Sequence, residues 1–292
     1  MEIKKIGVIG SGVMGSGIAQ ACAQGGYKVT MRDIEQKFVD AGFESIKKSL
    51  GRFVKSGKMT QKDAGEVVGR IKGTLDLKEV GKDVDLIIEA IFEDMEAKKA
   101  LFKELDEICP EGTIFASNTS TLMVTDMAVA VKRREKFIGM HWFNPAPIMR
   151  LVEVIKGAET SDETYNMTAD LCKKLGKIPV KAEDGPGFFT SRFLASYLME
   201  AVRLFECGIA GIKEVDTMCK LGFGWPMGPF ELMDLTGIDI PVHAAEYVYK
   251  ETGDPKYAVP ITIKKLVKAG YIGNKLGSKG GWYDYFKIEK ER

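Results

Sequence analysis

Short apolar runs alternate with longer amphipathic stretches from Met1 to about Val180. Apolar or β-branched runs of this length are typical of strands that are buried on both faces, and the stretches between them have the apolar spacing of helices. The alternation predicts an α/β domain built on a doubly wound parallel sheet of the Rossmann type. The expected strands are Ile6–Ile9, Lys28–Arg32, Val84–Glu89, Ile114–Ser117, Phe137–His141, Leu151–Ile155 and Ile178–Val180.

One polar stretch interrupts this alternation. The segment Ile34–Lys72 has helical periodicity with a break at Ser56-Gly57, which predicts a helical hairpin inserted after the second strand. A run of basic residues on its first helix is either a solvated face or a contact for the phosphates of a bulky acyl carrier such as coenzyme A. Composition alone leaves both readings open. The basic residues are Lys47, Lys48, Arg52 and Lys55.

Beyond Lys181 the pattern becomes helical throughout. The turn-rich run Asp184-Gly185-Pro186-Gly187 predicts a domain boundary, with a cofactor domain over residues 1–184 and an all-α domain over residues 185–292. The broad apolar face of the first helix in this second domain is wide enough to bury a partner subunit, which predicts a homodimer. The expected helices are Ser191–Glu206, Ile212–Leu221, Pro229–Leu235, Ile238–Lys250 and Ile261–Ala269.

Composition narrows the classes of function. The formal net charge of +1 gives no reason to expect nucleic acid or a membrane as partner. The first strand follows Met1–Lys5 directly, which leaves no room for a leader and predicts a cytoplasmic protein. The cysteines form no Cys-x-x-Cys pair, so we expect core thiols in a reducing compartment and no metal site. They are Cys22, Cys109, Cys172, Cys207 and Cys219.

A glycine-rich turn follows the first strand at once. Gly10 permits a tight turn, Gly12 lets the backbone approach a pyrophosphate, and Gly15 lets helix and strand pack closely. Such a pattern is weak alone, but Asp33 follows the second strand at the distance where a carboxylate binds a ribose 2′-hydroxyl and repels a 2′-phosphate. The predicted cofactor is therefore NAD. The turn reads Gly10-Ser11-Gly12-Val13-Met14-Gly15.

The candidate chemistry centres on His141, one of two histidines. It lies between the Ser117–Thr121 segment and a later strand that contains Glu153. A neutral imidazole is the usual general base near neutral pH, and a carboxylate partner fixes its tautomer. A hydroxyl, an imidazole and a carboxylate on neighbouring strand ends predict proton exchange with a substrate oxygen. The other histidine, His243, lies in a helical segment without a motif and is expected to be structural.

These residues belong to motifs that occur in the order and spacing of a known family. The chain resembles the 3-hydroxyacyl-CoA dehydrogenases, especially the short single-function bacterial kind, over almost its whole length. The resemblance implies an NAD-dependent oxidoreductase of fatty acid metabolism that interconverts (S)-3-hydroxyacyl-CoA, in particular 3-hydroxybutyryl-CoA, and 3-oxoacyl-CoA. The motifs are Gly10–Gly15, Glu89–Glu93, Ser117–Ser120, His141–Pro145, Asp184–Phe188 and Met227–Leu232.

The resemblance also implies roles for single residues. His141 is the expected catalytic base, Glu153 orients it, and Ser120 touches both the substrate and the nicotinamide. The expected cofactor contacts beyond the glycine-rich turn and Asp33 are Glu93, Lys98, Ser120, Asn144 and Lys275. Ser49 and Lys55 match the helical segment that meets coenzyme A, so the family favours a functional reading of the basic run.

One position departs from the family pattern. Shortly after Pro-Gly-Phe the family has an asparagine whose amide helps to hold the substrate carbonyl and the active-site carboxylate, and this chain has Ser191 there. A hydroxyl is shorter and has fewer hydrogen-bonding groups than an amide. Acyl specificity is therefore the property that Ser191 is expected to change. Two other functions stay open: a dehydrogenase of a free hydroxy acid or sugar acid on the same fold, and a non-catalytic nucleotide-binding protein.

Overall fold

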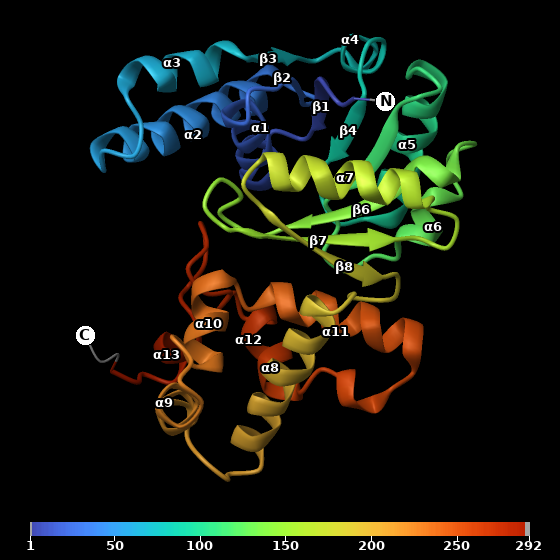
Figure 1. Ribbon diagram of the computed structural model, residues 1–292. Coiled ribbons are helices and arrows are strands. Elements are labelled where there is room, and N and C mark those ends of the chain that lie inside the picture. The colour runs from blue at the N-terminus through green and yellow to red at the C-terminus, as the bar shows by residue number, and fades with distance from the viewer. Residues whose placement is uncertain (1, 290–292) are drawn as a thin grey trace. The chain divides into compact units, whose positions relative to one another are not determined.

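The computed structural model describes residues 2–289. They divide into two compact units, with Gly185 ending the first and Pro186 beginning the second (Figure 1). Across the described residues, no helix combines the length and the apolar character needed to cross a bilayer. Each unit has its own hydrophobic core.

Unit 1 is built on one eight-stranded sheet with the order β3-β2-β1-β4-β5-β6-β7-β8. Neighbouring strands are parallel except β6 and β7, which are antiparallel. The doubly wound Rossmann-type fold is thus confirmed. The strands are β1 (Lys5–Ile9), β2 (Lys28–Arg32), β3 (Ile71–Thr74), β4 (Leu86–Glu89), β5 (Ile114–Ser117), β6 (Phe137–Trp142), β7 (Leu151–Lys156) and β8 (Ile178–Glu183).

Two details of the predicted sheet are wrong. The strand β3 was not expected, because its Ile71-Lys72-Gly73-Thr74 sequence lacks an apolar run and its first two residues were assigned to the helical hairpin. The expected all-parallel arrangement also fails at β7. The connection from Phe143 to Arg150 is shorter than the dozen or so residues that a parallel crossover needs, so β7 turns back beside β6.

Helices cover both faces of the sheet, as Figure 1 shows. The expected hairpin is present as α2 and α3, and α2 places its buried residues Val39, Ile46 and Leu50 opposite Lys48, Arg52 and Lys55. The helices of unit 1 are α1 (Val13–Gln24), α2 (Gln36–Lys55), α3 (Gln61–Gly69), α4 (Leu77–Gly81), α5 (Met95–Ile108), α6 (Val124–Ala128) and α7 (Asp162–Lys174), with a 3-10 turn at Arg134–Lys136.

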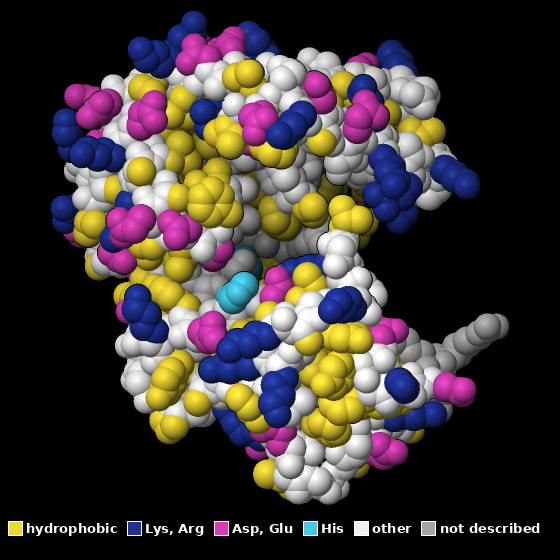
Figure 2. All heavy atoms as spheres, turned by 180° about the vertical axis from the view of Figure 1, so that it is seen from behind, with side chains coloured by type: hydrophobic (Ala, Val, Ile, Leu, Met, Phe, Trp, Pro, Cys, Tyr) yellow, Lys and Arg dark blue, Asp and Glu magenta, His cyan; other side chains and the backbone are white. Residues whose placement is uncertain are grey.

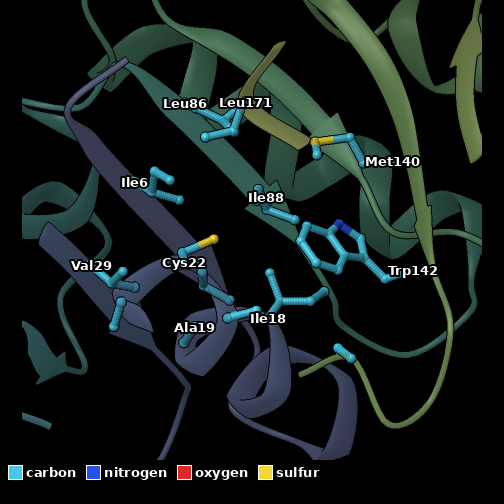
Figure 3. Packing of buried hydrophobic residues seen from close by; sticks show 14 of the residues in the cluster. Ile6, Ile18, Ala19, Cys22, Val29, Leu86, Ile88, Met140, Trp142 and Leu171 are labelled. Atoms are coloured by element: carbon cyan, nitrogen blue, oxygen red, sulfur yellow. The ribbon is translucent and has the colours of Figure 1, made fainter. Parts of the chain in front are cut away.

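Alternate residues of each strand serve the two faces of the sheet. On one face, Ile18 of α1 and Leu171 of α7 belong to the same buried cluster as Ile88 and Trp142 (Figure 3). On the other face, the ring of Phe102 in α5 contacts the rings of Phe115 in β5 and Phe137 in β6, with centroids 6.0 and 4.6 Å apart. Ser117 lies two residues after Phe115, and His141 lies four residues after Phe137. Both side chains therefore lie on the α5 face, near the carboxyl ends of their strands.

Unit 2 confirms the all-α prediction, since the part of it that the structure describes has helices and only an isolated bridge between Gly273 and Gly280. The short α13 was not expected, because a single helical turn carries too little periodicity to be recognised. The helices are α8 (Thr190–Glu206), α9 (Ile212–Phe223), α10 (Pro229–Thr236), α11 (Asp239–Thr252), α12 (Ile261–Lys268) and α13 (Trp282–Tyr285), with a 3-10 turn at Pro255–Tyr257.

A buried carboxylate joins three of these helices. Asp216 in α9 accepts hydrogen bonds from the backbone N–H groups of Phe230 (2.9 Å) and Glu231 (3.1 Å) in α10 and from the Tyr283 hydroxyl in α13 (2.7 Å). Burial raises the pKa of Asp216 to about 6, and these three hydrogen bonds oppose the rise. The carboxylate therefore has a structural role in unit 2.

The cysteines are free thiols, but Cys207 is exposed, so the expectation of a core thiol is wrong at that position. Burial raises the pKa of Cys172 to about 12, with Lys177 opposing the rise, so little thiolate forms there near neutral pH. Burial likewise raises the pKa of Cys109 to about 12. The buried thiols accordingly pack as small apolar residues.

Candidate active site

The glycine-rich turn between β1 and α1 has the geometry of a phosphate cradle. Gly10 has a φ of +97°, and a Cβ added to it would lie 2.5 Å from the Ala90 carbonyl oxygen. A Cβ on Gly15 would lie 1.8 Å from the Gly10 carbonyl oxygen, so α1 could not approach β1 with any larger residue there. At Gly12, by contrast, an added Cβ would meet no described atom within 4 Å. The turn is closed on its protein side and open where a ligand would approach.

The first turn of α1 can supply donors to that ligand. Its N-cap is Gly12, which has no side chain to accept from the N–H groups of the first turn. Helix N-termini of this kind bind phosphates through these N–H groups and the helix dipole. The residues present therefore fit a dinucleotide pyrophosphate.

Asp33 lies at the end of β2 beside the glycine-rich turn. Its Oδ2 accepts from the backbone N–H (2.7 Å) and hydroxyl (2.8 Å) of Ser11, and its Oδ1 accepts from the N–H of Ile34 (2.7 Å). These bonds tie the end of β2 to the glycine-rich turn. A carboxylate oxygen has two lone pairs, so Oδ1 can accept a ribose hydroxyl as well. The sequence did not predict the part played by Ser11 in orienting this carboxylate.

His141 and Glu153 form a buried pair. The two residues lie directly opposite each other in the antiparallel register of β6 and β7, which brings their side chains together on one face. His141 Nδ1 lies 2.6 Å from Glu153 Oε2, and the two side chains are 6% and 3% exposed. A carboxylate can only accept a hydrogen bond, so Nδ1 carries the proton and Nε2 is the nitrogen that can exchange one.

Phe143 shields this pair. Its ring centroid lies 4.4 Å from that of His141 with the planes tilted by 44°. An apolar ring beside the imidazole limits the approach of water and strengthens the electrostatic attraction between the imidazole and the carboxylate. Phe143 thus packs directly against the candidate base.

Ser120 lies in a segment that Glu93 organises. Glu93 Oε1 accepts from the Thr119 hydroxyl (2.6 Å), the Ser120 N–H (2.8 Å) and the Thr121 N–H (3.1 Å). The Asn118 side-chain oxygen accepts from the N–H of Trp142, the residue after His141 (3.0 Å). These bonds connect the segment that carries Ser120 to the strand that carries the histidine.

Lys98 is enclosed by protein. Its ammonium lies 2.6 Å from Glu89 Oε1 and 3.3 Å from Glu93 Oε2, and its side chain is 1% exposed. In the described structure its contacts are thus carboxylates of its own chain. Glu89 was not among the site residues expected from the sequence, although its position at the end of an apolar strand, beside the strand-ending Ser117, is a recognisable signal.

The remaining predicted residues are distributed over both units. Asn144 is exposed in the connection from β6 to β7. In α2, Ser49 is half-buried and Lys55 is exposed. Ser191 is half-buried in the first turn of α8, and Lys275 donates to Asp239 Oδ1 within unit 2 (2.6 Å).

A dinucleotide cradle and a buried histidine–glutamate pair on one sheet define the class of nicotinamide-dependent oxidoreductases. Residues 5–185 match the family 3-hydroxyacyl-CoA dehydrogenase, NAD binding domain, and residues 187–285 match 3-hydroxyacyl-CoA dehydrogenase, C-terminal domain. The chain belongs to the 3-hydroxyacyl-CoA dehydrogenase family, and its cofactor is NAD. The expectation drawn from the motifs is thus confirmed.

Relatives extend over nearly the whole chain. The 3-hydroxybutyryl-CoA dehydrogenase of Clostridioides difficile is 42% identical and covers 97% of this chain and 100% of its own length. The mitochondrial hydroxyacyl-coenzyme A dehydrogenase of Homo sapiens is 40% identical, with 97% and 91% covered. The crystal structure of (S)-3-hydroxybutyryl-CoA dehydrogenase from Ralstonia eutropha is similar with a TM-score of 0.91 at 40% identity, and covers 95% of this chain and 98% of that one.

Proposed function

We propose that the protein interconverts (S)-3-hydroxyacyl-CoA and 3-oxoacyl-CoA with NAD, and that 3-hydroxybutyryl-CoA is its principal substrate. The observation that carries this proposal is the buried contact of 2.6 Å between His141 and Glu153 on the dinucleotide-binding unit. The relatives named for 3-hydroxybutyryl-CoA support the substrate. A general base beside a dinucleotide cradle is what alcohol oxidation by hydride transfer requires.

In the oxidation direction, His141 Nε2 removes the proton of the substrate 3-hydroxyl. The bound NAD supplies an acceptor for the hydride that leaves C3. Glu153 stabilises the imidazolium that His141 becomes, because an opposite charge at hydrogen-bond distance favours the protonated ring. In the reduction direction, the same nitrogen returns the proton to the 3-oxo oxygen. We infer that Ser120, whose backbone is held by Glu93, binds this oxygen and orients the reacting carbon.

Three further residues have proposed roles. Asn144 lies two residues beyond Trp142 and contributes to the nicotinamide pocket, while Lys98 supports the cofactor side through Glu93. Ser191 stands where the family has an asparagine, and its hydroxyl is shorter and has fewer hydrogen-bonding groups than an amide. We infer that Ser191 shifts acyl preference, which rates over a series of acyl lengths in wild type and Ser191→Asn would measure. An unchanged preference would contradict this role.

The exposed face of α2 is the proposed contact for coenzyme A. Lys48, Arg52 and Lys55 are spaced so that they lie on one face of α2, and none of them forms an ion pair with another residue in the range 2–289. In Figure 2, Lys and Arg side chains gather at the end of unit 1 where the helical hairpin lies. These three side chains are therefore available to form charge-assisted hydrogen bonds with the phosphates of coenzyme A.

Replacing Lys48, Arg52 and Lys55 together by Gln is expected to raise the KM for 3-hydroxybutyryl-CoA by about tenfold or more, since each exposed charge contributes roughly 0.5 kcal/mol or more. The kcat should stay near that of wild type, because these side chains are exposed on α2, whereas His141 is buried in β6. A substrate truncated to the pantetheine thioester should show no such change. Steady-state kinetics at low ionic strength measures both.

The matched control for this triple variant is Lys174→Gln, which removes an exposed charge from α7. Its KM should equal that of wild type. If the triple variant keeps the wild-type KM for the full acyl-CoA, α2 is an ordinary solvated face and the coenzyme A assignment to this helix is wrong.

We also infer that two copies of the protein associate through unit 2. In α9, Met218, Leu221 and Phe223 are 54%, 82% and 67% exposed, an apolar set that suits burial against a second copy. Light scattering should give twice the 32.2 kDa of one chain, and Leu221→Glu should shift the mass to that of the monomer. A wild-type monomer would contradict the dimer.

We infer further that the protein acts in the cytoplasm. Recovery of the protein in another cell fraction would contradict this location.

A further inference from the structure

Glu89 is a fully buried carboxylate at the carboxyl end of β4, and the proposed chemistry does not use it directly. It is 0% exposed. Its Oε1 accepts from the Lys98 ammonium (2.6 Å) and the Ile91 N–H (2.7 Å), and its Oε2 accepts from the Ser117 hydroxyl (2.6 Å). A buried carboxylate stays ionised only when such partners stabilise its charge, so these contacts are needed to keep Glu89 charged.

One arm of contacts runs through β5. Glu89 and Ser117 are neighbours in the parallel register of β4 and β5, which places both side chains on the α5 face. The Ser117 hydroxyl that donates to Glu89 also accepts from the N–H of Thr119 (3.2 Å). The backbone carbonyl of Glu89 accepts from the N–H of Asn118 (2.8 Å). This arm therefore holds the start of the Asn118–Thr121 segment.

The other arm runs through α5. Lys98 bridges Glu89 to Glu93, and Glu93 Oε1 accepts the N–H groups of Ser120 and Thr121. Lys98 is enclosed between the two carboxylates, so its position fixes where Glu93 can lie. Both sets of contacts start from the carboxylate of Glu89, one from each oxygen, and both end on the Asn118–Thr121 segment.

We propose that Glu89 is a positioning residue for Ser120. This inference rests on the proposed function, in which Ser120 orients the substrate oxygen. A displacement of a contact residue by about 1 Å can cost on the order of 100-fold in rate. The competing explanation is that the Glu89–Lys98 pair only stabilises the fold, and buried pairs can usually be replaced by apolar residues without loss of stability.

The decisive variant replaces the whole pair by apolar side chains, as Glu89→Leu with Lys98→Met. Removing both charges avoids leaving one of them buried alone. The matched control is Asp106→Leu with Arg133→Met, which removes another ion pair of unit 1 (2.8 Å), whose arginine and aspartate side chains are 14% and 4% exposed and which has no bond to residues 118–121. Both double variants lose one carboxylate–cation pair. Only Glu89→Leu/Lys98→Met also removes the side-chain contacts that lead to the Asn118–Thr121 segment.

Two readouts separate positioning from stability. Hydrogen exchange of the Ser120 and Thr121 amides in the free protein is expected to be about tenfold faster or more in the Glu89→Leu/Lys98→Met variant, because local opening costs less. Its kcat for 3-hydroxybutyryl-CoA should fall by about 10- to 100-fold, with KM changed little. The Asp106→Leu/Arg133→Met control should keep wild-type exchange at Ser120 and Thr121 and wild-type kcat, whatever its melting temperature.

Conservative variants sharpen the comparison. Glu89→Gln keeps an acceptor for Lys98 and an amide beside Ser117, so it should recover most of the lost kcat. Should the apolar pair fail to fold, Ser117→Ala severs one arm without touching a charge and should still accelerate exchange at Thr119 and Ser120. Wild-type exchange and kcat in a folded Glu89→Leu/Lys98→Met variant, or in Ser117→Ala if that variant does not fold, would overturn the proposal. An equal loss of kcat in the Asp106 control would overturn it too.

The exchange measurement needs no substrate, so the two proposals can fail separately. If the wild-type protein does not oxidise a 3-hydroxyacyl-CoA, the proposed function is wrong, while the Ser120 amide still reports whether Glu89 positions it. If the wild type is active and the Ser120 amide does not respond, the proposed function stands and Glu89 has only a structural role.

Discussion

His141→Gln is expected to lower kcat for 3-hydroxybutyryl-CoA oxidation by about 10³-fold, which lies within the range that general acid–base groups contribute. The amide of Gln cannot take up a proton near neutral pH, so the 3-hydroxyl would lose its proton acceptor. Binding of NAD should be unchanged, because the glycine-rich turn and Asp33 do not contact His141. Stopped-flow absorbance of the reduced cofactor measures the rate, and fluorescence titration measures the affinity.

The control for this variant is His243→Gln. His243 is exposed in α11 of unit 2, and its replacement should leave kcat as in wild type. A wild-type rate in His141→Gln would show that another group exchanges the substrate proton.

Glu153→Gln is expected to lower kcat by about 10²- to 10⁴-fold while the affinity for NAD stays the same. The neutral amide cannot balance the charge of the imidazolium, and its NH₂ group can donate to Nδ1 and favour the wrong tautomer. A buried pair with an Nδ1–Oε2 distance of 2.6 Å loses both effects together. Single-turnover rates with saturating NAD isolate this step from binding and product release.

A suitable control for Glu153→Gln is Glu183→Gln, which changes an exposed carboxylate of β8 in the same unit. The control should keep the wild-type single-turnover rate. If Glu153→Gln is as fast as the control, the carboxylate only fills space beside the imidazole, and its assigned role in the dyad is wrong.

The doubly wound fold and the His141–Glu153 pair could be predicted because each rests on a strong local signal. Strands buried on both faces leave apolar runs, and a glycine-rich turn has few other uses after the first strand. Glu153 is an acid within an otherwise apolar strand, so it needs a hydrogen-bonding partner. His141, which lies on another predicted strand, can provide one. The register that joins His141 and Glu153 then follows from the short connection between β6 and β7.

Other features depended on tertiary contacts that no local pattern contains. The strand β3 is held by pairing with β2, and its polar, glycine-containing sequence gives no apolar run to recognise. Glu89 ends an apolar strand, but its importance comes from Lys98 and Ser117, which lie on a helix and on the neighbouring strand. Lys98 was assigned to the cofactor by resemblance, and only the structure brings it between two carboxylates.

The proposed activity is tested by an assay of NAD reduction with 3-hydroxybutyryl-CoA, longer 3-hydroxyacyl-CoA thioesters and free 3-hydroxybutyrate, repeated with NADP. We expect rapid NAD reduction with the (S)-3-hydroxybutyryl thioester, slower rates with NADP, and no turnover of the free acid. Turnover of the free acid alone would contradict the coenzyme A assignment and favour a hydroxy-acid dehydrogenase on the same fold.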